Sequence, residues 1–252
     1  MEKKRAPQLE NAAEFHAHTD DVFGRIANRY DLLCDLFSFG THRFWKQSVA
    51  AVIAKEPWSQ FLDGATGTGD IILRILNQKD LQEDQTVIAA DLSPQMLAIA
   101  RKRIQVYKHP VMFHVLDAHS MPQVPAASVD LYSISLALKI CERNQVLHEA
   151  MRVLRPNGRL VILEASNIPW PWLHQIYLLY MKLCMPIIGL LATGGDTSAY
   201  RYLIKGIESF PTAEMLAQEL ASLGFEDISF KRLSLGIVAI HVARKPNRNE
   251  KE

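Results

Sequence analysis

Short apolar runs alternate with longer amphipathic stretches from about residue 60 onward. The apolar runs are 60–65, 86–92, 111–118, 128–138, 158–166, 225–234 and 237–245. Runs of this length predict β-strands, and the helical spacing between them is typical of βαβ units in a mostly parallel sheet. The last two runs follow each other with no room for a helix, so we expect one antiparallel strand there. The pattern predicts an α/β fold with a seven-stranded sheet and helices on both faces.

Helix boundaries are marked by specific residues between these runs. Ser93 and Pro94 are suited to the N-cap and first position of a helix that begins after the second run. The stretch from 142 to 154 is expected to be helical and to stop at a Pro-Asn-Gly turn over 156–158. A further helix over 213–223 is expected to close at Gly224.

The regular alternation stops between about 167 and 210, after the fifth predicted strand. The apolar stretch over 165–195 contains Lys182 and Pro186, which favour a buried or interfacial helix over a membrane span. We expect a mobile arm over 1–20, one domain over 21–246 with this helical insertion, and a charged tail over 247–252.

Composition narrows the class of protein. The 28 Lys and Arg residues nearly balance 27 Asp and Glu residues, so the overall charge gives no reason to expect nucleic acid as a partner. Cys34, Cys141 and Cys184 are odd in number and widely spaced, which favours a reducing cytoplasm and neither a disulfide framework nor a metal site. The N-terminus has no apolar core of a secretory signal.

A glycine-rich turn, "LDGATGTGD" at 62–70, directly follows the first predicted strand. Glycines such as Gly67 and Gly69 let a chain turn tightly and let a ligand approach the backbone, although such turns also serve purely structural ends. Asp91 ends the next strand, where a carboxylate can accept hydrogen bonds from both ribose hydroxyls of a nucleoside. Together they predict a nucleoside site.

The order of the glycines separates the candidate nucleosides. Dinucleotide folds use G-x-G-x-x-G, whereas this turn has G-x-x-G-x-G followed by Asp70. We expect the Asp70 carboxylate to oppose a pyrophosphate and to suit a cation, so S-adenosylmethionine fits better than NAD. Asp117 and Ala118 after the third strand, and Ser135 after the fourth, are candidates for the remaining contacts.

These residues resemble the class I S-adenosylmethionine-dependent methyltransferases, through "LDGATGTGD", "AADLSPQML", "DAHSMP" and "RVLRPNGRLVILEAS". "ANRYDLLCDLFSFGTHRFWK" at 27–46, with "SAYRYLIKGIESFP" and "LSLGIVAIHVARKP" near the end, is similar to segments of the ubiquinone/menaquinone biosynthesis C-methyltransferases. The resemblance covers roughly 20–245 and implies a Rossmann-like class I methyltransferase fold.

The resemblance also implies an activity and a site. The activity is transfer of a methyl group from S-adenosylmethionine to a ring carbon of a polyprenylated hydroquinone, either demethylmenaquinol or a methoxy-polyprenyl-benzoquinol. By position in the motifs, the cofactor contacts are expected at Thr68, Asp91, Asp117, Ala118 and Ser135, beside Gly67 and Gly69 of the turn. Tyr30 of the "YD" signature is expected to close the site.

Methylation of a ring carbon needs an ionised hydroxyl on the ring, and therefore a base or a cation. Tyr30, His42, Lys139 and Glu164 are the candidates. Lys139 and Ile140 stand where this family usually has an Arg-Asn pair beside the acceptor. This departure leaves open a methyltransferase of the same lineage retargeted to another small aromatic, or a non-catalytic cofactor-binding partner of a quinone-biosynthesis complex. The apolar insertion suits a prenyl tail, a peripheral contact with the inner membrane or a homodimer contact.

Overall fold

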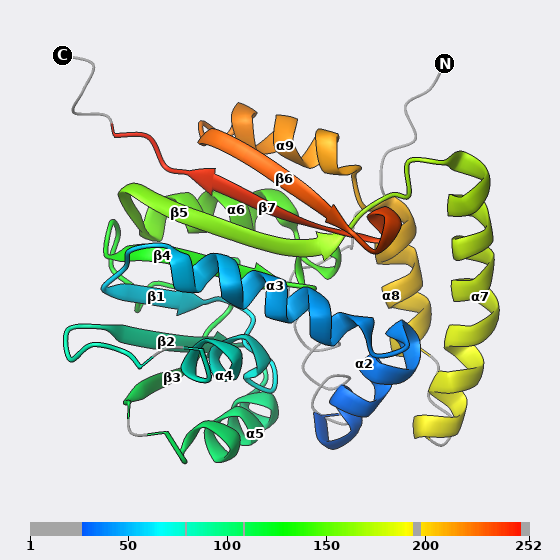
Figure 1. Cartoon of the computed structure of the whole chain (residues 1–252), viewed down its shortest axis with the longest axis horizontal. Helices are drawn as coiled ribbons and strands as arrows, with labels where there is room; N and C mark the ends of the chain where they lie inside the picture. The colour runs from blue at the N-terminus through cyan, green and yellow to red at the C-terminus, as the bar shows by residue number, and fades with distance from the viewer. Residues whose placement is uncertain (1–26, 79, 108, 194–197, 248–252) are drawn as a thin grey trace.

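The computed structural model describes residues 27–78, 80–107, 109–193 and 198–247, without the side chains of 28 and 188–203. The arm expected over 1–20 lies outside these residues, as does the tail beyond residue 247. Within the described residues the centre of the fold is one seven-stranded sheet in the order β3-β2-β1-β4-β5-β7-β6 (Figure 1). The strands are β1 (Gln60–Asp63), β2 (Thr86–Asp91), β3 (Val111–Val115), β4 (Val129–Ser135), β5 (Leu154–Ala165), β6 (Glu226–Leu233) and β7 (Val238–Arg244).

The predicted topology is confirmed. β1, β2, β3, β4 and β5 pair in parallel, and β7 runs antiparallel to both β5 and β6. The helices are α2 (Tyr30–Ser38), α3 (Thr41–Lys55), α4 (Asp70–Leu76), α5 (Pro94–Ile104), α6 (Arg143–Val153), α7 (Pro171–Thr193), α8 (Ser198–Ser209) and α9 (Ala213–Ser222). Three short 3-10 turns accompany them: η1 (Ala27–Arg29), η2 (Leu138–Ile140) and η3 (Ser234–Gly236).

Neighbouring strand residues bury their side chains on opposite faces of the sheet. Phe61 packs among residues of α3, α4 and α5, whereas Leu62 packs among residues of α6 and α9. Both side chains are fully buried. Because a parallel sheet between two helical layers is apolar on both faces, its strands read as continuous apolar runs in the sequence. That is why the strands could be located from the sequence.

The structure corrects the prediction of a turn over 156–158. α6 ends at Val153, and the chain passes directly into β5, which contains Pro156, Asn157 and Gly158. The register with β4 is irregular here, because Val129 pairs with Leu154 but Leu131 pairs with Arg159, and Asn157 has a φ of +64°. The backbone N–H of Asn157 donates to the carbonyl of Lys245, and the N–H of Lys245 donates to that of Gly158. Pairing with the chain after β7 therefore keeps these turn-forming residues in the strand.

Other boundaries follow the sequence more closely. The Ser93 hydroxyl caps α5 by accepting from the N–H of Met96, as predicted. Gly224 follows α9 with a φ of +92°, which also agrees. β3 and β4 end earlier than predicted, so Asp117 lies in a loop beyond Val115.

The insertion after β5 forms α7 and α8, which stand with α2 beyond the C-terminal ends of the parallel strands (Figure 1). Pro186 lies inside α7 and does not end it. Among the described residues, no helix has both the length and the apolar character needed to cross a membrane. In an open α/β sheet this edge is where ligands bind.

Candidate active site

The glycine turn between β1 and α4 is closed by Asp91. One oxygen of its carboxylate accepts the backbone N–H of Gly67 at 2.7 Å, and the other accepts that of Ser93 at 2.9 Å. Gly67 has a φ of +55°, and a Cβ atom built there would meet no atom within 4 Å. The backbone of Gly67 is therefore open to a ligand, as the sequence predicted.

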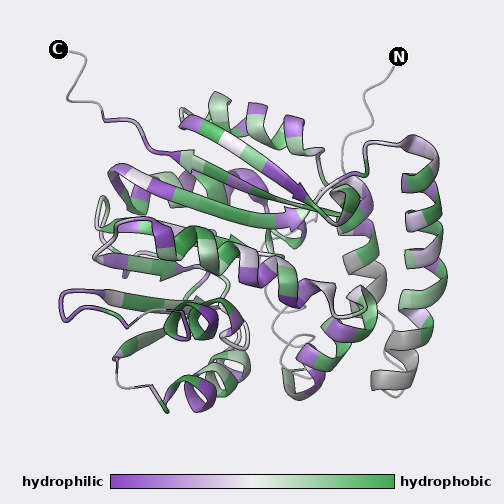
Figure 2. Ribbon diagram, in the orientation of Figure 1, coloured by the Kyte–Doolittle hydropathy of each residue, from purple (hydrophilic) through white to green (hydrophobic). Residues whose placement is uncertain are grey.

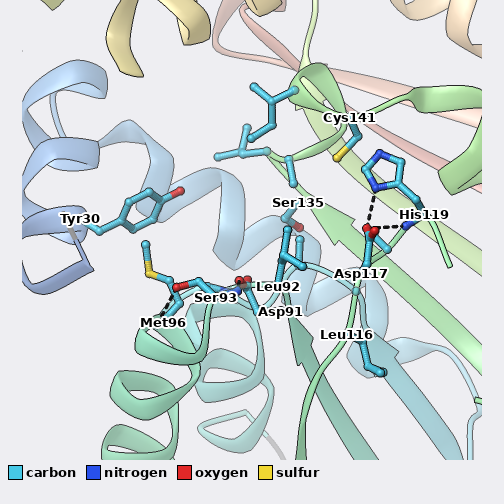
Figure 3. Close-up of a pocket in the computed structure, with 17 residues that line it drawn as sticks. Tyr30, Asp91, Leu92, Ser93, Met96, Leu116, Asp117, His119, Ser135 and Cys141 are labelled. Atoms are coloured by element: carbon cyan, nitrogen blue, oxygen red, sulfur yellow. Dashed lines mark hydrogen bonds and ion pairs between the residues drawn. The ribbon is translucent and has the colours of Figure 1, made fainter. Parts of the chain in front are cut away.

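A cavity that is open to solvent lies over this turn (Figure 3). Of the predicted cofactor residues it is lined by Gly67, Asp91, Asp117, Ala118 and Ser135. Leu92, Met96 and Leu116 add apolar surface. The structure thus brings together five predicted residues that are spread over some 70 positions of sequence, at the carboxyl ends of four adjacent strands.

Asp117 is held by a residue that the sequence reading missed. His119 donates its backbone N–H to Asp117 Oδ1 at 3.0 Å, and its Nδ1 lies 2.5 Å from the same oxygen. Since the N–H of Glu142 donates to Nε2 of His119, that nitrogen is unprotonated and Nδ1 carries the proton. His119 therefore orients the Asp117 carboxylate at the cavity wall. In the sequence, the position of His119 two residues after Asp117 was the feature that could have indicated this contact.

The lining fits S-adenosylmethionine. Ser135 Oγ is buried and has no hydrogen-bond partner in the part of the chain that the structure describes, so it can serve a polar group of a ligand. The Asp91 carboxylate at the cavity wall is the kind of acceptor that ribose hydroxyls require, and the apolar side chains suit a base. No group of three or more His, Cys, Asp or Glu residues placed to hold a metal ion occurs among the described residues.

Thr68 and Gly69 do not line this cavity. The Thr68 hydroxyl donates to Asp31 Oδ1 of α2 at 2.9 Å. A Cβ at position 69 would lie 3.1 Å from the Cβ of Ala100, so Gly69 allows α4 and α5 to approach each other. Thr68 thus joins the turn to the N-terminal helix.

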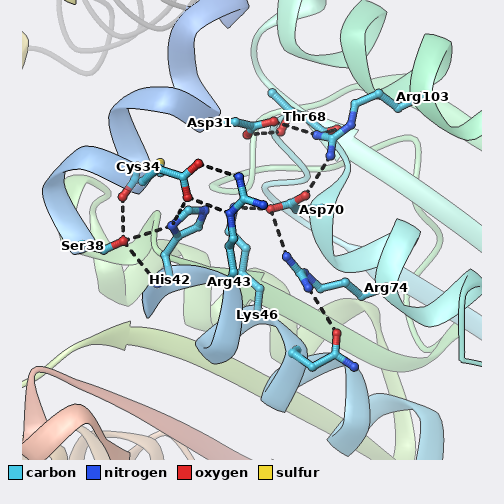
Figure 4. A network of polar contacts seen from close by, with 12 residues as sticks. Asp31, Cys34, Ser38, His42, Arg43, Lys46, Thr68, Asp70, Arg74 and Arg103 are labelled. Carbon is cyan, nitrogen blue, oxygen red and sulfur yellow. Dashed lines mark hydrogen bonds and ion pairs between the residues drawn. The ribbon is translucent and has the colours of Figure 1, made fainter. Parts of the chain in front are cut away.

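The interpretation of Asp70 was wrong. Its carboxylate does not line the cavity but accepts from Lys46 of α3 at 2.9 Å and from Arg103 of α5 at 3.0 Å (Figure 4). Burial alone would raise the pKa of Asp70, but Lys46 and Arg103 lower it to about 2. Asp70 is therefore a structural anion whose charge is already matched, and it does not select between cofactors.

A second cavity of about 880 Å³ lies beside the first and shares Tyr30 and Leu136 with it. Its walls come from α2, α3, α7, α8, η2 and β7. They are mostly apolar, with residues such as Leu33, Phe37, Trp45, Tyr177, Met181, Met185 and Ile207. Its polar side chains include all three predicted catalytic residues, Tyr30, His42 and Lys139. We call the first the cofactor cavity and the second the acceptor cavity.

Lys139 is fixed at the wall of the acceptor cavity by a buried ion pair. Its Nζ lies 3.0 Å from Glu164 Oε1 and also donates to the carbonyl of Leu136. Glu164 additionally accepts the backbone N–H groups of Lys139 and Ala165. Gly206 of α8 packs directly on this turn, since a Cβ there would lie 2.8 Å from the Lys139 carbonyl oxygen. The ammonium is therefore oriented from several sides.

Tyr30 and the thiols near the cavities stay protonated near neutral pH, so they cannot accept a proton there. The pKa of Tyr30 is raised well above 10, mainly by its contact with Cys34 and to a lesser extent by burial. Burial raises the pKa of the Cys34 thiol and that of Cys141, the latter to about 12. Cys34, Cys141 and Cys184 are all free thiols of intermediate exposure.

Asp63, at the end of β1, is a buried carboxyl that the sequence reading did not single out. It accepts from the Ser133 hydroxyl at 2.6 Å, while its Oδ2 has no partner within the described ranges. Burial raises its pKa from 3.8 to about 6, despite the opposing effect of the Ser133 hydrogen bond. Its ionisation therefore opposes folding.

Replacing Asp63 by asparagine should make the unfolding free energy less sensitive to pH. Because the pKa is higher in the folded state, the wild type loses stability as pH rises from about 4 to about 6, and the loss is complete above 6. Relative to Asp63→Asn, the wild type should lose about 3 kcal/mol over this interval. Urea unfolding of both proteins across this range tests it; parallel pH profiles would contradict it.

The fold and the two cavities define a class I S-adenosylmethionine-dependent methyltransferase. The family model of the ubiE/COQ5 methyltransferase family matches residues 11–245, and the chain belongs to that family. Relatives named ubiquinone/menaquinone biosynthesis C-methyltransferase UbiE include one from Rickettsia bellii, 36% identical over 93% of this chain and 95% of its own length. Another, from Paracoccus denitrificans, is 37% identical over 87% of each chain.

Solved structures agree on the fold. A SAM-dependent methyltransferase from Thermotoga maritima aligns with a TM-score of 0.65 and 17% identity, over 90% of this chain and 100% of its own. The plantazolicin methyltransferase BpumL, solved with a substrate analogue and SAH, aligns with a TM-score of 0.59 and 13% identity, over 93% and 99% of the two chains. Both confirm the predicted class I architecture.

Proposed function

We propose that this protein methylates a ring carbon of a polyprenylated hydroquinone. The observation that carries the proposal is the acceptor cavity, which is largely apolar, adjoins the cofactor cavity and has His42 and Lys139 among its polar side chains. The relatives that are 36–37% identical are named ubiquinone/menaquinone biosynthesis C-methyltransferase, which supports this proposal. A hydroquinone has two oxygens for such polar groups and a prenyl tail for the apolar wall.

The chain's own residues have a limited chemical task. S-adenosylmethionine supplies an activated methyl group on a sulfonium, so the protein must align the acceptor and exclude water. The shared wall of Tyr30 and Leu136 is where the two cavities meet. The Lys139 ammonium is placed to stabilise an ionised ring hydroxyl, and its pairing with Glu164 holds it there.

Methyl transfer to defined acceptors tests the function. The purified chain is incubated with labelled S-adenosylmethionine and, separately, demethylmenaquinol, a methoxy-polyprenyl-benzoquinol and tail-less ring analogues. The proposal expects label in a prenylated quinol and much weaker labelling of the tail-less rings. Efficient labelling of the tail-less rings alone would favour the retargeted methyltransferase. Lys139 and Ile140, which replace the usual Arg-Asn pair, are the observation that supports that alternative. No labelling of any acceptor, despite cofactor binding, would reject the proposal.

We further propose that the outer face of α7 lies on a lipid surface. Five apolar residues on this face are each 56–65% exposed: Trp172, Ile176, Leu179, Leu183 and Ile187. The opposite face supplies Tyr177, Met181 and Met185 to the acceptor cavity. Hydrophobic residues run along the whole described length of this helix (Figure 2). One helix would thus connect the membrane, where a prenylated acceptor resides, with the cavity that receives it.

Vesicle binding should depend on this face. The double variant Leu179→Glu/Leu183→Glu should sediment with phosphatidylcholine/phosphatidylglycerol vesicles at least roughly tenfold less than wild type, since each buried leucine contributes about 1.5–3 kcal/mol. Met215→Glu on α9 is the matched control, because Met215 is equally exposed but lies away from α7. Equal sedimentation of all three proteins would contradict the proposal. If the wild type is a dimer and the double variant is a monomer, the exposed face of α7 would instead be an interface with a second copy of the chain.

A further inference from the structure

His42 lies where α2 and α3 meet the acceptor cavity. It is 2% exposed, and it lines the cavity together with Cys34 and Ser38 of α2. The tight connection between the helices brings these residues together, since only Phe39 and Gly40 separate α2 from α3. Both connecting residues have positive φ. The imidazole is therefore held by its immediate neighbours.

The hydrogen bonds of Ser38 determine which imidazole nitrogen carries the proton. The Ser38 hydroxyl donates its only proton to the carbonyl of Cys34, at 2.6 Å, and its oxygen accepts the backbone N–H of His42. The 3.0 Å contact between Ser38 Oγ and His42 Nδ1 therefore requires a proton on Nδ1. In the neutral imidazole, Nε2 then has the lone pair, and it has no hydrogen-bond partner among the described residues.

Charges around the ring allow it to be neutral at rest and to accept a proton. Burial lowers the pKa of His42 below 6.5, and Lys46 lowers it further. Asp35 acts in the opposite direction, with Oδ1 3.6 Å from Nδ1. Asp35 is itself fixed by Arg43, whose Nε and Nη2 donate to its two oxygens. An imidazolium formed at Nε2 would therefore have a carboxylate on its far side.

The ring is surrounded by several titratable or charged groups. They are Asp35 and Cys34 from α2, Arg43 and Lys46 from α3, Asp70 from α4 and, across the cavity, Tyr30, Lys139 and Tyr177. Tyr30 keeps its proton, and Lys139 is engaged with Glu164. Among these groups, His42 is the one that lines the cavity as a neutral imidazole with an unprotonated nitrogen, Nε2.

We propose that His42 Nε2 takes the proton from a ring hydroxyl of the acceptor, and that Ser38 positions it by holding the Nδ1 proton. This inference rests on the proposed function. The O–H bond breaks and its proton moves to Nε2, leaving a phenolate beside Lys139. The ring carbon then bonds to the methyl group while the sulfur keeps the electron pair of the broken S–CH3 bond. The proton on that carbon leaves to water, and His42 returns its own proton to the oxygen.

The tautomer can be measured without turnover. Long-range proton–nitrogen correlation spectra of the full chain, with the His42 signals assigned by comparison with His42→Gln, should show a protonated Nδ1 and a bare Nε2 above pH 6.5. Ser38→Ala should shift His42 toward the opposite tautomer, which loss of packing alone would not do. A protonated Nε2 in the wild type would overturn the inference.

Turnover tests the proton transfer. His42→Gln should lower kcat by roughly 10²–10⁴-fold, the usual contribution of a positioned base, with unchanged S-adenosylmethionine affinity. The control is His148→Gln, on the exposed surface of α6. kcat/KM of the wild type should fall on the acid side of 6.5, whereas His42→Gln should lack this limb. Added imidazole should restore part of the activity of His42→Ala.

The outcomes separate the two proposals. If the wild type methylates quinols and His42→Gln keeps a kcat within twofold of it, His42 is not the base and the proposed function stands. If the wild type methylates no quinol, the proposed function fails together with the proton transfer assigned to His42. The spectra still report the tautomer in that case, so the two failures are distinguishable.

Discussion

Replacing Asp91 by alanine should weaken S-adenosylmethionine binding by roughly 10²–10⁴-fold while the protein remains folded. Hydrogen bonds to a charged group contribute about 1.5–3 kcal/mol each, and two ribose hydroxyls would lose theirs. The variant also removes the acceptor of the Gly67 and Ser93 N–H groups, so the turn itself loses its support. Titration calorimetry measures the affinity.

The control for this experiment is Asp84→Ala, since Asp84 is exposed in the loop before β2. Circular dichroism of both variants should match the wild type, because Asp91 is at the end of its strand and not in the apolar core. Unchanged affinity in Asp91→Ala would show that the cofactor cavity has been assigned wrongly. Reduced affinity in both variants would also contradict the assignment, since Asp84 does not line the cavity.

The second large effect concerns stability. Lys139→Met should lower the free energy of unfolding by about 3–5 kcal/mol, because it leaves the Glu164 carboxylate buried without its cation. Glu164 is 1% exposed, so water cannot replace the lost partner. The double variant Lys139→Met/Glu164→Gln should recover most of the loss, since no unpaired charge is then buried.

Urea unfolding of the single and double variants gives these energies, and methyl transfer is measured on the same samples. Both variants should be nearly inactive, because the ammonium at the acceptor cavity is absent from each. Recovery of stability without recovery of activity would separate the two roles of Lys139. A single variant as stable as the double variant would contradict the structural role.

The sheet was predictable because its strands are buried on both faces and separated by capped helices. Ser93, for example, has the side chain that an N-cap needs, and it makes the expected hydrogen bond. The β5 start was not predictable from local residues. Pro156, Asn157 and Gly158 favour a turn locally, whereas in the structure Asn157 and Gly158 exchange backbone hydrogen bonds with Lys245, some 90 positions away.

In the cofactor cavity, too, some residues could be placed from the local sequence and others depend on partners far away in the chain. Asp91 and Asp117 could be placed because the ends of parallel strands lie at one edge of a sheet. Asp70 could not, since its partners Lys46 and Arg103 lie 24 and 33 positions away and nothing in the local sequence indicates them. The Thr68 hydroxyl is similarly taken by Asp31, from another helix. Local motifs located the binding edge but not which side chains face it.

The attachment of α2 to the rest of the protein depends in part on an ion pair that responds to ionic strength. This helix contributes to both cavities through Tyr30, and Asp31 joins it to Arg103 at 3.0 Å. Asp31 and Arg103 are 39% and 33% exposed, so dissolved ions screen their attraction, unlike that of the buried pair at Lys139. We therefore expect a high-salt buffer to weaken the attachment of α2 through Asp31 while leaving the buried ion pair of Lys139 intact.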